Sequence, residues 1–200
     1  MLAETTRAPQ HSLRMADSQP VGEALVLHLA SIGLPTDSGR SLRWVRVQLL
    51  RVPITFPNFA ARRQIVFWHD VHHLLTGYQT TWAGEAEIGG FEIASGCRSY
   101  WAAWCFNFGG WLFGLASAPR RLFAGFVRGR HCTNFYGVDE ARVARMTVAA
   151  AREQLGLLRA VPPATFADAA LFAGWSLLIV AFYVVLPLLV VGFGLAWLIG

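Results

Sequence analysis

The stretch FWHDVHHLLTGYQTTWAGEAEIGGFE, from Phe67 to Glu92, gathers acid and imidazole in an otherwise apolar chain. It carries three of the chain's six histidines, His69, His72 and His73, together with four carboxylates. Helix positions four apart share a face, so His69 and His73 are expected to project together, one turn apart. Two imidazoles bind one metal ion in this geometry. A helix through these histidines is therefore the element on which both fold and site depend.

The residues around the histidines predict where this helix begins and ends. The run NFAARRQIVFWHDVHHLL indicates one helix, with Asn58 as a plausible N-cap and Gly77 as the C-terminal stop. QTTWAG is predicted to be a turn, and the next helix starts near Gly84 and carries Glu85. A continuous helix would leave Glu85 about 18 Å beyond His73, but a second helix that folds back can return it to the histidines.

These residues predict a metal site made of His69, Asp70, His73 and Glu85. Asp70 lies about 100° around the helix from His69, yet three residues before His73, so it can reach the same side. Two nitrogens with one or two carboxylates suit zinc, iron or manganese. The structural alternative is a solvated helix face or a set of hydrogen-bonded core histidines.

Composition narrows the class of protein. The chain is 54% hydrophobic and 14% charged, with a mean hydropathy of +0.41, which points towards a membrane. Its net charge of +5 suits an anionic membrane surface. The arginines are scattered rather than arranged in a basic stripe, so we expect no nucleic-acid partner. Three cysteines without a Cys-x-x-Cys motif disfavour a disulfide framework or a cysteine-based zinc site.

An uncharged run from Leu171 to Ile199 predicts a membrane anchor. As a straight helix it would be roughly 44 Å long, whereas the hydrocarbon core of a bilayer is about 30 Å thick. A tilted span, a span kinked at Pro187 or a tight re-entrant hairpin would fit. Arg152 and Arg159 precede the run and nothing charged follows it. By the positive-inside rule, the preceding domain lies on the cytoplasmic face of the membrane.

The fold class we expect is all-α: a membrane-associated helical domain with a C-terminal transmembrane or re-entrant helix. Residues 1–20 are predicted to be disordered, 21–163 to form the helical metal-binding domain, and 166–200 to form the anchor. Within the domain, further helices are expected over Gly22–Leu34, after the break in Leu34–Leu50, and over Val138–Arg159. Tyr100–Ala118 is apolar enough to span a bilayer, but its glycines and aromatic residues favour a buried or interfacial helix.

Three metal-binding motif families fit the histidine stretch only partly. The zincin motif His-Glu-x-x-His needs glutamate as the base, and Asp70 is one methylene shorter. The letters His-x-x-His-His resemble one box of the membrane desaturases and hydroxylases, but the chain's other histidines are isolated. The HD phosphohydrolases need an upstream histidine and a late aspartate, for which His28 and Asp139 have unconvincing contexts.

The stretch resembles the Coq-four family of ubiquinone (coenzyme Q) biosynthesis proteins. The hallmark of that family is His-Asp-x-x-His, eleven residues, then Glu, and eleven residues, Leu74 to Gly84, separate His73 from Glu85 here. The Leu-Thr-Gly-Tyr element and the later Arg-Glu-x-Leu-Gly pattern are also similar to the family. The resemblance covers roughly Leu34 to Leu158.

This resemblance implies an all-helical, membrane-associated protein that binds a divalent metal, usually zinc, through His69, Asp70, His73 and Glu85. The implied activity is oxidative decarboxylation of a polyprenyl-hydroxybenzoate-type quinone precursor, in which hydroxyl replaces carboxylate. Asp70 or Glu85 would relay a proton. Implied partners are the prenylated precursor or another lipid, other quinone-biosynthesis enzymes and a homo-oligomer. The alternatives are a lipid-binding scaffold for those enzymes and a membrane metallohydrolase or hydroxylase. The extra His72 and the apolar tail depart from the family pattern.

Overall fold

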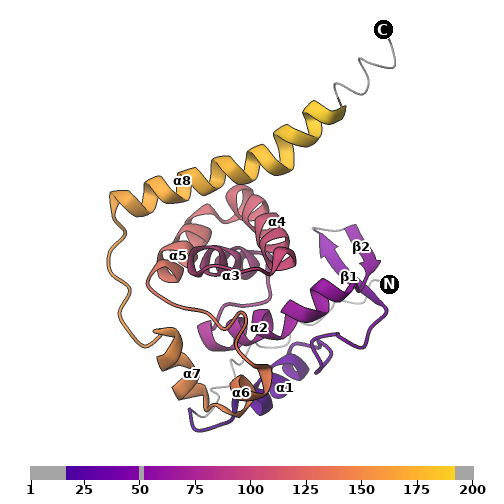
Figure 1. Ribbon diagram of the computed structural model, residues 1–200, viewed down its shortest axis with the longest axis vertical. Coiled ribbons are helices and arrows are strands. Elements are labelled where there is room, and N and C mark those ends of the chain that lie inside the picture. Colours follow the sequence, from indigo (N-terminus) through magenta and orange to yellow (C-terminus); the bar gives the residue numbers. More distant parts are fainter. Residues whose placement is uncertain (1–16, 50–51, 192–200) are drawn as a thin grey trace, which may run out of the picture.

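A central helix pair carries the histidine stretch. The structure is a computed structural model that describes residues 17–49 and 52–191 of the 200-residue chain. Helix α2 (Ala60–Thr76) is followed, after a short link, by α3 (Trp82–Ser95). Helix α3 packs against α4 (Trp101–Ser117) and α5 (Pro119–Arg130), while α2 contacts α1 (Val21–Ser31), α4 and α7 (Val148–Leu155) (Figure 1). The described part of the chain is therefore mostly helical, as expected.

The link between α2 and α3 follows local backbone rules. Gly77 adopts the left-handed conformation, with φ of 77°, and its N–H donates to the carbonyl of His73. The predicted end of α2 is thereby confirmed. The side chain of Thr81 accepts the N–H of Gly84 and caps α3, which begins at Trp82, slightly earlier than predicted. The predicted N-cap of α2 was wrong. Phe59 occupies that position, because the Asn58 amide donates to the carbonyls of Gly39 and Leu42 instead.

A β-hairpin replaces one predicted helix. The run expected to be helical through Leu50 forms β1 (Trp44–Leu49), which pairs antiparallel with β2 (Val52–Pro57) in the register Trp44↔Pro57 to Leu49↔Val52. The sequence WVRVQL alternates apolar and polar residues with a period of two and is rich in β-branched valine, both typical of a strand. The all-α expectation therefore fails for this hairpin.

The predicted helix over Val138–Arg159 is divided into α6 (Glu140–Arg145) and α7. Thr147 lies at the break, and its side chain caps α7 by accepting the N–H of Ala150. The N-terminal segment pairs with the chain here, because the N–H of Val148 donates to the carbonyl of Gln19. Residues 17–20 are thus ordered, which corrects the predicted disorder for that part of 1–20. Residues 1–16 lie outside the described residues.

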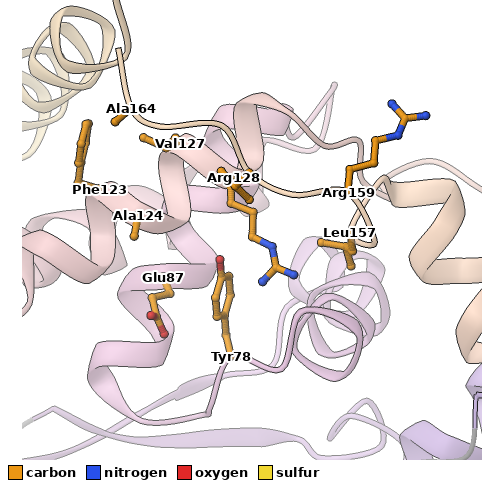
Figure 2. Close-up of a pocket in the computed structure, with 10 residues that line it drawn as sticks. Tyr78, Glu87, Phe123, Ala124, Val127, Arg128, Leu157, Arg159 and Ala164 are labelled. Carbon is orange, nitrogen blue, oxygen red and sulfur yellow. The ribbon is translucent and has the colours of Figure 1, made fainter. Parts of the chain in front are cut away.

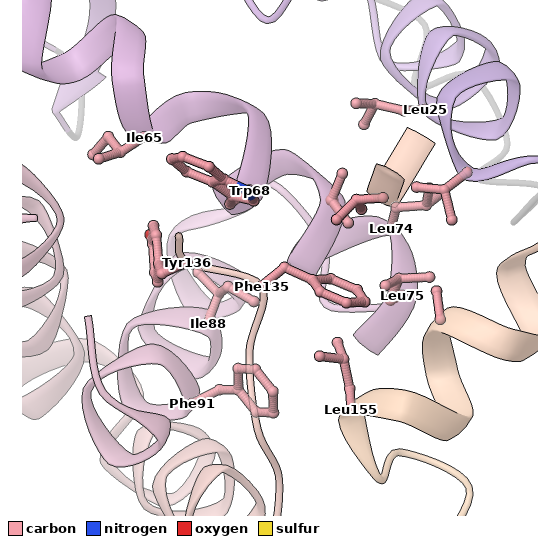
Figure 3. Packing of buried hydrophobic residues seen from close by; sticks show 14 of the residues in the cluster. Leu25, Ile65, Trp68, Leu74, Leu75, Ile88, Phe91, Phe135, Tyr136 and Leu155 are labelled. Carbon is pink, nitrogen blue, oxygen red and sulfur yellow. The ribbon is translucent and has the colours of Figure 1, made fainter. Parts of the chain in front are cut away.

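Two hydrophobic clusters hold the helices together. The first lies where α1, α2, α3 and α7 meet and includes Trp68, Leu75, Phe91 and Tyr136 (Figure 3). The second joins α3, α4 and α5 to α8 (Phe166–Val180), with these buried members: Ala86, Ile93, Trp111, Leu122, Phe126 and Ile179. The site described below belongs to the α2–α3 contact beside the first cluster.

Close approach of α5 to α3 depends on glycine. A Cβ atom at Gly125 or Gly129 would collide with the α3 backbone at Glu87 and Phe91, respectively. Their spacing is the Gly-x-x-x-Gly pattern that lets two helix backbones approach closely. This contact fixes α3, and therefore the carboxylates that α3 carries.

The apolar tail forms a helix that lies partly against the domain. The helix Phe166–Val191 is long and apolar enough to cross a membrane, and it includes a π-helical turn, Ala181–Val185, before Pro187. The indole N–H of Trp111 donates to Ser176 Oγ at 3.1 Å, and Ile179 is fully buried. Figure 1 shows α8 lying across α4 and α5. The predicted anchor therefore shares core contacts with the helical domain, and residues 192–200 lie outside the described part.

Candidate metal centre

Three side chains from α2 and α3 converge on one point. His69 and His73 project from the same face of α2, and their Nε2 atoms are 3.3 Å apart. Glu85, in the first turn of α3, brings Oε2 to 3.5 Å from His69 Nε2 and Oε1 to 3.4 Å from His73 Nε2. Within the described residues, these three form a group that can hold a metal ion. The folded-back second helix thus brings Glu85 to the histidine pair, as the helix break predicted.

The distances within the triangle are compatible with one metal ion bound by all three side chains. Zinc binds imidazole nitrogen at about 2.0–2.1 Å in tetrahedral geometry, which places two nitrogen ligands about 3.3–3.4 Å apart. The observed separation of the Nε2 atoms is 3.3 Å. A tetrahedral ion held by these three side chains would keep one coordination position for water or a substrate, as catalytic zinc sites do.

Hydrogen bonds at the other ring nitrogens orient both imidazoles. Nδ1 of His73 lies 2.9 Å from the carbonyl oxygen of Tyr78, which can only accept, so the proton is on Nδ1. Nδ1 of His69 lies 3.3 Å from both carboxylate oxygens of Glu92 and donates to them. In the neutral rings, both Nε2 lone pairs then face each other and the Glu85 carboxylate. Such a set of facing acceptors needs a proton or a metal cation between them.

Glu92 is the buried carboxylate behind the site. Besides His69, it accepts hydrogen bonds from His72 Nδ1 at 2.7 Å, Asn107 Nδ2 at 2.6 Å and Tyr136 OH at 2.7 Å. A carboxylate that receives the outer N–H of a ligating histidine fixes its tautomer and raises its basicity as a ligand. This role of Glu92 was not predicted from the sequence. The available signal was spacing, because Glu85 and Glu92 are seven residues apart and share a helix face.

His72 has a structural role, and both of its ring nitrogens are engaged. The backbone N–H of Phe135 donates to Nε2 at 2.9 Å, so the proton is on Nδ1 and is donated to Glu92. The ring is fully buried. The extra histidine therefore ties α2 to the loop before α6 and has no free nitrogen to offer a metal.

Asp70 is not a member of the described ligand group. Its charge acts on a neighbouring cation: burial lowers the pKa of the Arg62 guanidinium, and the charge of Asp70 opposes that shift. Asp70 is half-buried. Its role as a fourth ligand or as a proton relay stays a prediction.

The electrostatics of the centre favour a cation. Burial alone would raise the pKa of Glu85, but its close interactions with His69 and His73 outweigh burial and lower that pKa. Burial likewise opposes ionisation of Glu92, yet His69 and His72 hold its pKa well below the usual range. For His69, burial lowers the pKa, but the two glutamates outweigh this and raise it well above the ordinary value. Two ionised carboxylates therefore surround the histidine pair.

Access to the triangle is from the side of His69 and Glu85. Their side chains are 24% and 33% exposed, whereas His73 is only 2% exposed. Solvent therefore reaches the triangle beside the Glu85 carboxylate. No protein-family model, curated protein or solved structure matches this chain.

Proposed function

We propose that His69, His73 and Glu85 bind one divalent cation, with zinc first and iron or manganese as the other candidates. The observation that carries this proposal is the triangle of ligand atoms, 3.3–3.5 Å on each edge, with both outer Nδ1 atoms anchored. Imidazoles held in this way offer Nε2 lone pairs in a fixed direction, so little ordering is needed when a cation binds.

We further propose that this centre belongs to a membrane enzyme of quinone biosynthesis, which replaces the ring carboxylate of a prenylated hydroxybenzoate by hydroxyl. The motif and its spacing support the proposal. With water as oxygen donor, the carboxylate leaves as carbon dioxide, and one proton and two electrons are released. A two-electron acceptor is then a required co-substrate, because zinc has no redox chemistry. A bound cation would neutralise the carboxylate and phenolate oxygens of the aromatic head.

The chain's own residues would position the aromatic head and move the proton. Glu85, 33% exposed beside the open position, can accept the proton released there. Asp70 is the second candidate for this role. Glu92 acts through His69 and is a positioning residue. The proposal also includes a location on the cytoplasmic side of a membrane, other quinone-biosynthesis enzymes as partners and assembly into a homo-oligomer.

An exposed aromatic patch supports a location at a membrane. The patch consists of the exposed Phe59, Trp101 and Phe106 and the half-buried Phe56, and neighbouring ring centroids are 6.0–6.5 Å apart. Trp101 is 60% exposed and Phe106 is 42% exposed. Clustered aromatic side chains of this kind favour the interface between headgroups and hydrocarbon. Together with the exposed face of α8, they give the domain an apolar surface suited to a lipid substrate.

Metal analysis and turnover test the proposal together. The purified chain should contain about one divalent ion, as zinc sites of this geometry do, and His69→Ala/His73→Ala should remove it. His131→Ala replaces an exposed histidine outside the group and serves as the control. A short-chain prenylated 4-hydroxybenzoate is then incubated with the loaded protein and a two-electron acceptor, and carbon dioxide and the hydroxylated product are measured.

Each result has a distinct meaning. Metal loss in the double variant together with metal-dependent product formation supports the enzyme. Metal and lipid binding without product, in the presence of dioxygen or a quinone as acceptor, would overturn the enzyme in favour of the scaffold. Full metal retention in the double variant would refute the site itself.

A further inference from the structure

One imidazole of the candidate centre depends on a backbone group outside the helices. Nδ1 of His73 donates to the carbonyl oxygen of Tyr78 at 2.9 Å. Tyr78 lies in the link between the last residue of α2 and the first residue of α3, so helix geometry does not fix the position of this carbonyl. His69 differs, because its acceptor is the side chain of Glu92 within α3. The direction of the His73 ring therefore depends on the side chains that hold the link in place.

Arg128 from α5 holds this link at two points. Its Nη1 atom donates to the carbonyl of Thr76 at 3.2 Å, and its guanidinium carbon lies 5.5 Å from the ring centroid of Tyr78. Arg128 and Tyr78 both line the cavity shown in Figure 2, where the arginine side chain extends from α5 towards the tyrosine ring. A guanidinium group stacks on an aromatic ring and donates in fixed directions, so one side chain restrains both the end of α2 and the residue that supplies the carbonyl.

Helix α5 is held close to α3, which gives Arg128 a fixed base. Gly125 and Gly129 flank Arg128 in the sequence, and a Cβ atom at either position would collide with the α3 backbone. The Tyr78 ring also meets Phe91 of α3 edge-on, with 6.5 Å between the ring centroids. The link therefore contacts side chains from two helices that are packed against each other.

We propose that Arg128 is a positioning residue for the metal centre. It holds the turn Thr76–Tyr78, and through the Tyr78 carbonyl it keeps the ring proton of His73 on Nδ1. The Nε2 lone pair of His73 is then directed at the point where the other two ligands converge. Without Arg128 the carbonyl is free to shift, and the proton can move to Nε2, which then has no lone pair for a metal. This inference rests on the metal binding proposed above.

Two measurements on the full chain in detergent micelles test this role. ¹⁵N NMR of the metal-free, histidine-labelled protein reports which ring nitrogen of His73 carries the proton, and His73→Gln assigns the signal. The wild type should show the Nδ1–H form, whereas Arg128→Met should show a mixture of both tautomers. Zinc affinity is then measured by competition with a chromophoric chelator. Arg128→Met should lower it about tenfold, the lower end of the range for groups that orient ligating histidines.

Arg152→Met is the matched control. Arg152 Nε donates to the carbonyl of Leu75 at 3.2 Å, and its Nη1 atom binds Asp17 rather than the link. Loss of either arginine removes one positive charge from the C-terminal end of α2, but only the loss of Arg128 releases Tyr78. Arg152→Met should therefore keep the Nδ1–H form of His73 and leave the zinc affinity close to that of the wild type.

Two further variants test the contact itself. Tyr78→Leu keeps the backbone carbonyl but removes the ring, so it should repeat both effects of Arg128→Met. Combining these two substitutions should add little to either one, because the two side chains act through one contact. Arg128→Lys keeps the charge but lacks the planar group that stacks on the ring, and it should recover part of the affinity. Circular dichroism checks that each variant is folded.

The outcomes separate this role from the metal proposal. A folded Arg128→Met protein with the Nδ1–H form of His73 and wild-type affinity would overturn the inference. Equal losses in Arg128→Met and Arg152→Met would also overturn it, since they would indicate a general effect of charge at the end of α2. If Arg128→Met does not fold, an unchanged His73 signal in Tyr78→Leu has the same meaning. If the wild type binds no zinc but Arg128→Met still mixes the tautomers, the metal proposal fails and the hold of Arg128 on His73 stands.

Discussion

Glu92→Gln should weaken metal binding without touching a metal ligand. The substitution keeps the shape of the side chain but replaces one acceptor oxygen by an NH₂ donor. All four groups around Glu92 approach with donors: the rings of His69 and His72, the amide of Asn107 and the hydroxyl of Tyr136. The amide and the hydroxyl can turn to accept, but the two imidazoles are more constrained.

The constraint on the imidazoles sets how much metal affinity Glu92→Gln is expected to lose. His72 cannot move its proton to Nε2 without losing the bond from the Phe135 N–H. His69 can, but its Nε2 would then carry a proton and could not bind a metal. Loss of such a supporting carboxylate typically costs 10–100-fold in metal affinity, or about 1.4–2.7 kcal/mol. We expect a loss in that range for Glu92→Gln.

Competition with a chromophoric zinc chelator at pH 7 measures the affinity. Glu87→Gln is the matched control, since Glu87 lies on the same helix but pairs with Arg121 at the surface. Tyr136→Phe removes one of the four bonds and should change the affinity less than Glu92→Gln does. Circular dichroism of the metal-free proteins checks that each variant is folded. A folded Glu92→Gln variant with affinity within twofold of the wild type would refute the supporting role of Glu92.

Three further predictions concern packing, pH and the membrane. Gly125→Ala should destabilise the protein by about 1–3 kcal/mol, because the added Cβ would collide with the α3 backbone. Gly109→Ala is the control, since its Cβ would lie in open space and should not destabilise the protein. Thermal unfolding measures the stability of both variants. Burial lowers the pKa of His69, but the neighbouring carboxylates outweigh burial and raise this pKa. Protonation of His69 therefore stabilises the metal-free protein. This stabilisation is fully present below pH ~6.5 and is lost as pH rises through the raised pKa. Zinc affinity should rise over the same interval, because the metal displaces that proton; an affinity that does not change from pH 6 to pH 8 would contradict this. Trp101→Ser should reduce binding of a chain truncated after residue 183 to anionic vesicles by severalfold in a flotation assay, and unchanged binding would show that the aromatic patch does not touch lipid.

The hairpin and the N-cap of α2 show where local patterns were misleading. Residues 44–49 were expected to be helical, although their alternation favours the strand that they form. Asn58 has a strong N-cap preference, yet its amide serves three carbonyls of the preceding loop. Both errors concern partners that lie elsewhere in the chain, β2 for the strand and the 39–42 loop for Asn58, and local spacing does not record such partners.

The sequence alone determined those features of the site that arise within one helix or at its end. The four-residue spacing places His69 and His73 on one face whatever packs around them, and Gly77 stops the helix because it tolerates positive φ. The uncharged tail likewise follows from composition. Tertiary structure decided the rest. The packing of the helices buries His72 in the core, keeps Asp70 out of the ligand group and places Glu92 behind His69. The physical reason is burial. A carboxylate withdrawn from water must find its hydrogen-bond donors wherever the fold supplies them, and here they come from α2, α4 and the loop before α6.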